Sequence, residues 1–300
     1  DLPQLAAALE TEWHAPLLTL PKVDQQRLLT PLLEQYRLSA THLNNYLDVT
    51  KGGPEFFLLR NLLHLPEAMS PHAVYGSAVH AVLQRAHQHL SAQGTLRPVE
   101  DCLREFETAL QGAQLSDSDR QKFIDRGTRS LTSFFEQRSH SFTPSQQVER
   151  SFSGDHVRVG DAQMTGALDL IDIDHDEKTI FVTDYKTGKP VASWKGRTDY
   201  ERLKLHHYEQ QLMMYKLLVE HSRQFTGYTV TGARIEFVEP DERGEIVLLD
   251  YAYSDEKLTE FTTLVEAAWR HIQALDFTLA DTYDPTLAGV LAFEAFLRTT

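Results

Sequence analysis

Apolar and polar residues follow two different patterns along the chain, and the change falls near residue 147. Before that point, apolar residues recur at the three- and four-residue spacing of an amphipathic helix. The strongest segment of this kind predicts a helix over residues 71–90, with one apolar face made by Val79, Leu83, Ala86 and Leu90. Residues 1–140 are therefore predicted to be all-helical.

Other helices of this half are predicted from capping residues and prolines. Residues 1–38 form an amphipathic helical pattern, which we expect prolines to interrupt because they lack a backbone donor; these are Pro16, Pro21 and Pro31. Ser39 is a suitable N-cap for a helix over residues 41–46. After a break at residues 51–54 the apolar pattern resumes over 56–63, and further helices are predicted near 99–110 and 117–137.

The second half alternates between strand and helix patterns. Strands are predicted over residues 148–152 and 157–159, and two longer ones over 166–174 and 179–187. The polar link 175–178 is short enough to join the last two as an antiparallel hairpin. A helix over 206–220, strands over 229–238 and 245–253, and a closing helix over 258–272 follow. This order predicts an α+β core behind a helical N-terminal half.

Length and composition set limits on these elements. The 300 residues suit one large domain or two, and 41% of them are hydrophobic, which is enough for a substantial core. No apolar run approaches the roughly 18 residues of a membrane span, and no signal peptide is recognisable. The single cysteine, Cys102, excludes a disulfide framework within the chain and indicates a reducing, cytoplasmic location. Because the chain begins at Asp1 and not at Met, we expect it to be part of a longer protein.

The charge distribution is uneven. The formal net charge is −14, which argues against a uniform nucleic-acid-binding surface. Cations nevertheless concentrate between residues 186 and 207, at Lys186, Lys189, Lys195, Arg197, Arg202 and Lys204. Trp194, Tyr200, His206 and His207 lie among them. This segment is either a solvated flexible loop or a groove that guides phosphates, and its place directly after a predicted strand favours the groove.

Candidate chemistry lies on the predicted hairpin. In a strand over 179–187, Asp184 and Lys186 project to the same face, and the pairing can bring Asp169 beside them. Two carboxylates and a lysine together are costly unless a cation such as Mg²⁺ is bound, since hard cations take carboxylate and phosphate oxygens. The alternative is an ordinary Asp–Lys ion pair on a solvated strand.

Four short motifs follow one another along the chain: Gly76-x-x-x-His80, Gly166-Ala-Leu-Asp169, Asp184-Tyr-Lys-Thr-Gly188 and Gln211-Leu-Met-Met-Tyr215. Their order resembles the RecB-like branch of the PD-(D/E)XK nucleases, which includes the nuclease domains of RecB and AddB and the CRISPR-associated four-cysteine exonucleases. Residues 38–46 also resemble the opening helix of that branch. The resemblance covers residues 38–275, and it is specific because the motifs occur together and in order.

The resemblance implies a metal site and a set of catalytic residues. His80, Asp169 and Asp184 match metal ligands of the family, the carbonyl of Tyr185 can add an oxygen, and Lys186 matches the catalytic lysine. Gln211 and Tyr215 match residues that position this lysine and the nucleic-acid backbone. Glu149 matches a glutamate on the strand before the hairpin, where it either binds the metal through water or supports the site. The implied cofactor is Mg²⁺ or Mn²⁺.

One departure concerns an iron–sulfur cluster. Several relatives carry Cys-Pro after the opening helix and three further cysteines near the C-terminus, which together bind the cluster. Here Gly53-Pro54 stands at the first of these positions and Cys102 is the only cysteine. We therefore expect no iron–sulfur cluster, and core packing in its place.

The resemblance implies a restriction-endonuclease-like core, a central mixed sheet flanked by helices. Its expected parts are an N-terminal helical segment (1–38), a helical region with the His motif (39–146), the nuclease core (147–280) and a C-terminal tail or helix (281–300). The implied function is a metal-dependent DNA nuclease or exonuclease acting on single-stranded DNA or DNA ends, within a superfamily 1 helicase-nuclease of repair or recombination. The alternative is an inactive nuclease-fold module for DNA binding or scaffolding. Polarity and exo- versus endonuclease action stay open.

Overall fold

The computed structural model describes residues 22–66 and 69–300. The described part of the N-terminal half is helical, as predicted, whereas residues 1–21 of the predicted helical segment 1–38 lie outside the described residues. Its elements are α2 (Lys22–Glu34), α3 (Ala40–Leu47), a 3₁₀ turn (Val49–Lys51), α4 (Gly53–Phe57), a π-helical turn (Leu58–Leu62), α5 (Pro71–Gln93), α6 (Val99–Gln111), α7 (Asp117–Arg138) and a 3₁₀ turn (Ser139–Ser141). Ser39 caps α3 by accepting a hydrogen bond from the backbone N–H of His42.

A five-stranded mixed sheet forms the centre of the second half. Its strands are β1 (Gln147–Ser151), β4 (Ala167–Asp174), β5 (Thr179–Lys186), β6 (Thr229–Pro240) and β7 (Ile246–Tyr251), side by side in that order. The predicted hairpin of β4 and β5 is confirmed as antiparallel, and β5 pairs with β6 in parallel. Because these parallel neighbours need a crossover, α8 (Asp199–Glu220) connects them.

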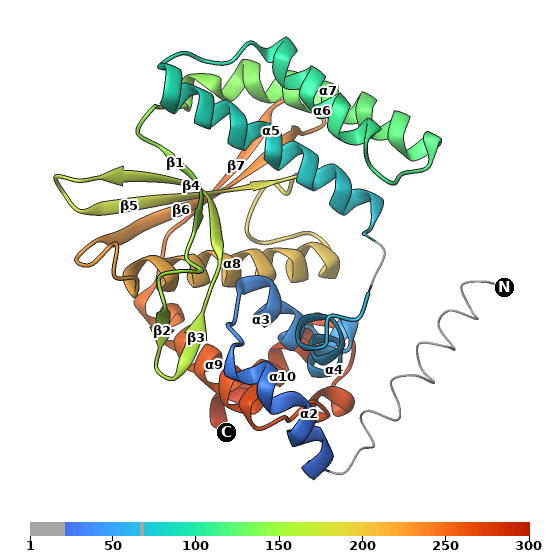
Figure 1. The fold of residues 1–300 in the computed structure, drawn as a ribbon, viewed down its shortest axis with the longest axis vertical. Helices are drawn as coiled ribbons and strands as arrows, with labels where there is room; N and C mark the ends of the chain where they lie inside the picture. The colour runs from blue at the N-terminus through green and yellow to red at the C-terminus, as the bar shows by residue number, and fades with distance from the viewer. Residues whose placement is uncertain (1–21, 67–68) are drawn as a thin grey trace.

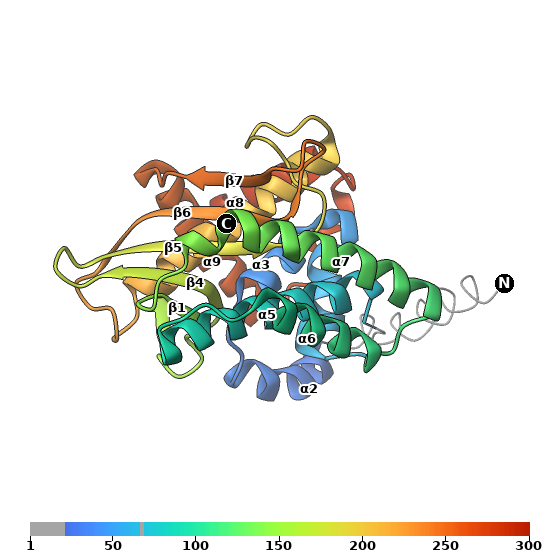
Figure 2. The same cartoon turned by 90° about the horizontal axis from the view of Figure 1, so that it is seen from above.

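Helices cover both faces of the sheet. Figures 1 and 2 show α5, α6 and α7 over one face, and α8 on the other with α3 and α9 (Asp255–Gln273) beyond it. The alternation of β5 explains the two layers: Ile180 and Val182 enter the core on the α8 side, whereas Tyr185 enters the core formed with α5–α7. No helix in the described residues combines the length and apolarity of a membrane span.

The N-terminal helices are joined to the C-terminal end of the chain by aromatic packing. The ring of Phe57 in α4 stacks on Phe277 at 6.2 Å between centroids. The hydroxyl of Tyr46 donates to the carbonyl of Asp276 over 3.3 Å. A 3₁₀ turn (Leu279–Thr282) and α10 (Leu287–Thr299) complete this region, where a Cβ built on Gly53 would lie 3.3 Å from the Cβ of Ala280.

The predicted interruption at Pro31 is wrong, because α2 continues through it to Glu34. A proline inside a helix costs about 3 kcal/mol. Leu29 and Leu33 are buried on the inner face of α2, and full burial of one such side chain contributes about 1.5–3 kcal/mol. The free energy gained by burying these two leucines therefore exceeds the cost of the proline. Pro16 and Pro21 lie outside the described residues.

The start of the helix predicted from residue 206 is also wrong. α8 begins at Asp199, and the hydroxyl of its N-cap Thr198 accepts a hydrogen bond from the N–H of Glu201. The first turn carries Asp199, Glu201 and Arg202, so it lacks the apolar spacing on which the prediction relied. Arg202 and Lys204 consequently lie on a helix and not in a loop. The short strand β3 (Ala162–Met164), which pairs with β2 (Val157–Val159), was not predicted.

A glycine in α7 allows the helical layer to pack closely. A Cβ on Gly127 would overlap the ring of Phe106 in α6, which is fully buried. We predict that Gly127→Ala lowers the free energy of unfolding by about 1–3 kcal/mol, the usual cost of overpacking. Urea unfolding measures this. Gly112→Ala is the matched control, since its Cβ would lie 3.7 Å from the nearest atom at an exposed helix end; equal stability of both variants would contradict the prediction.

Candidate metal centre and active site

The site begins where strands β4 and β5 separate. Their register runs from Asp174 opposite Thr179 to Leu170 opposite Thr183. Beyond this point, the N–H of Tyr185 donates to Oδ2 of Asp169 over 2.9 Å. The carboxylate of Asp169 is thus held by the backbone of the neighbouring strand.

Glu149 lies on β1, which pairs with β4 along the edge of β4 that faces away from β5. β1 and β4 pair through Val148 with Leu170 and through Arg150 with Leu168, which places Glu149 opposite Asp169 in the register. Its backbone is left-handed, with φ of +50°. Such a conformation costs a residue other than glycine about 1–2 kcal/mol, and strain of this kind concentrates at functional sites. It turns the strand at the point where two carboxylates meet.

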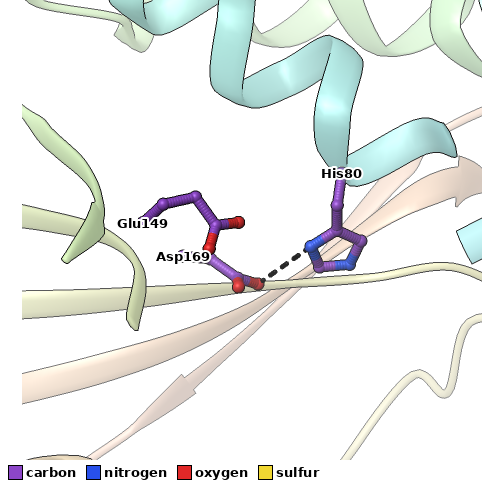
Figure 3. A group of neighbouring side chains, drawn as sticks. All are labelled: His80, Glu149 and Asp169. Carbon is purple, nitrogen blue, oxygen red and sulfur yellow. Dashed lines mark ion pairs between the residues drawn. The ribbon is translucent and has the colours of Figure 1, made fainter. Parts of the chain in front are cut away.

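His80 completes the group from the helical layer. It extends from α5 toward the sheet, with Nδ1 3.5 Å from Oδ2 of Asp169 (Figure 3). One ligand atom from each of His80, Glu149 and Asp169 lies within 4.8 Å of the others. An imidazole and two carboxylates at this separation can hold a divalent cation.

The charges of this group influence one another. Burial raises the pKa of Glu149, and the negative charge of Asp169 raises it further. Burial alone would also raise the pKa of Asp169, but its hydrogen bond to His80 and the charge of Lys186 lower that pKa overall. Burial favours neutral His80, whereas the contact with Asp169 outweighs it and raises the pKa of the imidazole. A cation would relieve the repulsion between the carboxylates.

Asp184 and Lys186 form a second group beside the first. Asp184 is buried, with only 1% of its surface exposed. Its Oδ2 lies 2.7 Å from Nζ of Lys186, and its Oδ1 accepts a hydrogen bond from the hydroxyl of Tyr215 over 3.0 Å. Burial raises the pKa of Asp184, although the Lys186 ammonium opposes that effect.

Helix α8 supports this ion pair through two residues one turn apart. The Lys186 ammonium donates to Oε1 of Gln211 over 2.6 Å, and Nε2 of Gln211 donates to the Tyr215 hydroxyl over 2.5 Å. Asp184, Lys186, Gln211 and Tyr215 thus form a closed hydrogen-bonded circuit. The sequence predicts all four as site residues, and the structure brings them together.

The predicted metal ligands divide between the two groups. His80, Asp169 and Glu149 face one another, whereas the Asp184 carboxylate contacts Lys186 and Tyr215. The side chain of Tyr185 points to the sheet face that α5–α7 cover, opposite to the face on which Asp184 contacts α8. There the Tyr185 hydroxyl and Nε2 of His87 are 2.9 Å apart. Any role of Tyr185 in metal binding therefore falls to its backbone carbonyl.

The sequence reasoning did not identify His87. It lies seven residues after His80 and thus on the same face of α5, which is the signal that could have revealed it. Burial lowers the pKa of His87 to about 4, so the imidazole is neutral at pH 7. Its contact with Tyr185 fixes α5 against β5, which helps to place His80.

Tyr208 of α8 is a further neighbour of Lys186 that the motifs do not include. In the structure its ring lies 4.9 Å from Nζ of Lys186 and 5.5 Å from Nζ of Lys204. The signal was the spacing, since Tyr208 lies three residues before Gln211 and four after Lys204.

Two glycines shape the turn after Lys186. A Cβ on Gly76 would lie 3.2 Å from Oγ1 of Thr187, so this glycine lets α5 approach the turn closely. Gly188 has φ of +109°, which favours glycine, and its N–H donates to Oε1 of Glu239 over 2.8 Å. Glu239 also pairs with Arg126 of α7 at 2.7 Å. The turn is therefore held by both the sheet and the helical layer.

The basic segment, which comprises the cations of residues 189–204, follows this turn. Several of these cations are already paired. Nζ of Lys189 lies 3.3 Å from Glu242, and Arg202 contacts Asp199 at 2.9 Å. Lys204 donates to the carbonyl of Lys189 over 3.2 Å. Lys195 and Arg197 are exposed. Two adjoining clefts run along the segment, one lined by Arg197 and Arg243 and the other by Lys204, with Lys189 in both.

Comparison with known families gives a match over most of the chain. The family described as the PD-(D/E)XK nuclease superfamily matches residues 37–284. The match includes α5 with His80, the whole five-stranded sheet and α8. A search of curated proteins finds no match.

Proposed function

The chain belongs to the PD-(D/E)XK nuclease superfamily, and we propose that it is an active deoxyribonuclease domain that requires Mg²⁺ or Mn²⁺. Members of the superfamily are generally phosphodiester hydrolases that use divalent metal ions. One observation carries the proposal: the His80–Glu149–Asp169 group lies beside the Asp184–Lys186 pair at the end of β5. A potential cation site and a positioned ammonium are thus adjacent.

The donor set fits a divalent cation. Asp169 and Glu149 provide oxygens and His80 provides a nitrogen. Burial raises the pKa of Glu149, and the negative charge of Asp169 raises it further. We propose His80 and Asp169 as ligands, with Asp184 and the Tyr185 carbonyl completing the site and Glu149 binding directly or through water. A bound divalent cation supplies charge neutralisation for the phosphate and makes water easier to deprotonate.

Lys186 supplies the charge that the chain itself directs at the reacting phosphate. Its side chain is 18% exposed, so the ammonium lies at the edge of the core and is reachable from solvent. Gln211 and Asp184 hold its position, which means little reorganisation is needed when negative charge develops on the phosphate oxygens. In this proposal Lys186 is catalytic, and Gln211 and Tyr215 position it.

We further propose single-stranded DNA or DNA ends as the substrate. The clefts beside the turn after Lys186, with Lys189, Arg197 and Lys204 in their walls, support this choice. The motif order supports a role within a superfamily 1 helicase-nuclease in repair or recombination. The packing of Gly53 near Ala280 supports the proposal that no iron–sulfur cluster joins this region.

A cleavage assay tests the proposal. The purified chain is incubated with a short labelled single strand in Mn²⁺ and, separately, in EDTA. We expect cleavage that depends on Mn²⁺. Tight binding of the strand without cleavage in Mg²⁺ or Mn²⁺ would instead support the inactive binding module.

The salt dependence of DNA binding tests the basic segment. Lys195 and Arg197 are exposed beside the clefts, and each phosphate contact adds about −0.7 to the slope of log K against log salt for single strands. We predict that replacing both by glutamine makes this slope shallower by about 1.4. The control replaces Lys122 and Arg129, exposed on α7, by glutamine. Equal slopes for the two double variants would place the strand elsewhere.

A further inference from the structure

One face of α8 connects the catalytic residues to the surface. Five of its side chains follow one another at intervals of three or four residues, which places them along one stripe of the helix. From the inner to the outer end they are Tyr215, Gln211, Tyr208, Lys204 and Tyr200.

Contacts along this stripe are continuous at its inner end. Tyr215 and Gln211 contact Asp184 and Lys186, as described above. Tyr208 follows, with its ring 4.9 Å from Nζ of Lys186 and 5.5 Å from Nζ of Lys204. One ring therefore lies close to two ammonium groups.

Lys204 is suited to bind an anion. Burial lowers the pKa of its ammonium, and the nearby charge of Lys186 lowers it further, although Glu201 and Glu239 oppose this. Its hydrogen bond goes to the neutral carbonyl of Lys189, and within the described residues no carboxylate oxygen lies within 4.0 Å of Nζ. A phosphate between Lys186 and Lys204 would neutralise both cations.

Tyr200 lies at the outer end of the stripe and is 76% exposed, more than any other aromatic residue that the structure describes. It lines a cleft of about 480 Å³ together with Thr187, Gly188, Lys189 and Lys204. Glu201 also lines this cleft, but its carboxylate already accepts a hydrogen bond from the N–H of Arg197 over 2.6 Å. The cleft thus joins an exposed ring to cations and to the turn directly after Lys186.

We propose that this cleft is a nucleotide subsite, in which Lys204 binds a phosphate near the scissile one and Tyr200 stacks on an unpaired base. The inference rests on the proposed nuclease function and specifies its substrate. Tyr200 lies eleven positions before Gln211 on the helix, or about 16 Å along its axis. Tyr200 therefore contacts a base away from the cleaved bond. Inside a duplex each base face is covered by the neighbouring base pairs, so the subsite favours the unpaired bases of a single strand.

Loss of the ring tests the stacking. Affinities for a short single strand are measured in Mn²⁺, with Lys186→Gln present in every protein so that hydrolysis is suppressed while Asp184 keeps a hydrogen-bond donor. Stacking of one base on an aromatic residue is worth about 5- to 140-fold in affinity. We predict a loss in this range for Tyr200→Ala and a change of less than about threefold for Tyr200→Phe, which keeps the ring. Phe296→Ala, at an exposed aromatic residue of α10, is the control and is expected to bind normally.

A scan with abasic sites shows whether the ring acts on a base. Removing one base at a time from the strand should weaken binding at a single position when Tyr200 is present. The same removal should have no effect with Tyr200→Ala, a coupling that a structural role of the tyrosine would not produce. Equal affinities of Tyr200→Ala and its parent would overturn the subsite, and so would an effect of Tyr200 that is independent of every base. The proposed nuclease function would still stand in either case if the wild-type chain cleaves in a metal-dependent manner. If the wild-type chain neither binds nor cleaves single strands, both proposals fail.

Discussion

Replacing Lys186 by alanine is expected to slow hydrolysis of a short single strand in Mn²⁺ by about a hundredfold or more, the cost of losing one preorganised stabilising charge. The ammonium is held by Gln211 and Asp184 at the end of β5. Its benefit is larger in the transition state, where the phosphate gains negative charge, than in the bound ground state. DNA affinity should therefore change little, since Lys189, Lys204 and Arg197 remain.

The buried position of Asp184 requires a control for folding. Lys186→Ala leaves this carboxylate without its cation, and breaking a buried ion pair costs about 3–5 kcal/mol when the charge persists. Lys186→Gln keeps a donor for Asp184 and serves as the second variant. Both should lose cleavage, while circular dichroism and urea unfolding establish that at least Lys186→Gln is folded. Lys122→Ala, on the exposed side of α7, should cleave at the wild-type rate. Cleavage by folded Lys186→Gln at the wild-type rate would remove Lys186 from catalysis.

Replacing Asp169 by asparagine is expected to abolish hydrolysis and to weaken Mn²⁺ binding by about a hundredfold or more, because even groups that only orient metal ligands contribute 10- to 100-fold. Asparagine can still accept the hydrogen bond from the Tyr185 N–H, so the junction of β4 and β5 should persist. Isothermal titration with Mn²⁺ in the absence of DNA measures the binding directly.

Asp172 provides the matched control for this measurement. It lies on the same strand three residues later, and its carboxylate accepts a hydrogen bond from Gln146 over 2.8 Å, outside the metal group. Asp172→Asn should bind Mn²⁺ and cleave like the wild-type chain. Asp184→Asn should also lose hydrolysis and bind the ion more weakly. Unchanged Mn²⁺ binding in both Asp169→Asn and Asp184→Asn would remove the proposed site.

The elements around the site were predictable because their sequence signals are local. Alternation and β-branched residues identify β4 and β5, and the four-residue link identifies their antiparallel pairing. The interval between Gln211 and Tyr215 places both on one face of α8, where the structure shows them joined to Asp184 and Lys186. In each case, residues close in sequence determine the geometry.

Other features depend on contacts between distant segments, which no local pattern encodes. α2 continues through Pro31 because Leu29 and Leu33 are buried against the rest of the core. The left-handed backbone of Glu149 is not signalled by its residue type, since glutamate seldom adopts positive φ. Likewise, the contact between His87 and Tyr185 joins residues 98 positions apart.

The largest difference between the expected and the observed site concerns the partners of the carboxylates of Asp169 and Asp184. The motifs place Asp169 and Asp184 together as metal ligands, whereas in the structure Asp169 faces His80 and Glu149, and Asp184 faces Lys186. The position of Glu149 within 4.8 Å of His80 and Asp169 and its strained backbone support our proposal that this glutamate takes part in metal binding. Which carboxylates contact the ion is therefore the central question for the mechanism.

Anomalous diffraction from a crystal soaked in Mn²⁺ answers it most directly. We predict a manganese peak where β4 and β5 separate, within coordination distance of Asp169 and His80, with Asp184 or Glu149 as a further ligand. A peak elsewhere, or none at a Mn²⁺ concentration that supports cleavage, would contradict the metal site on which the proposed nuclease function depends.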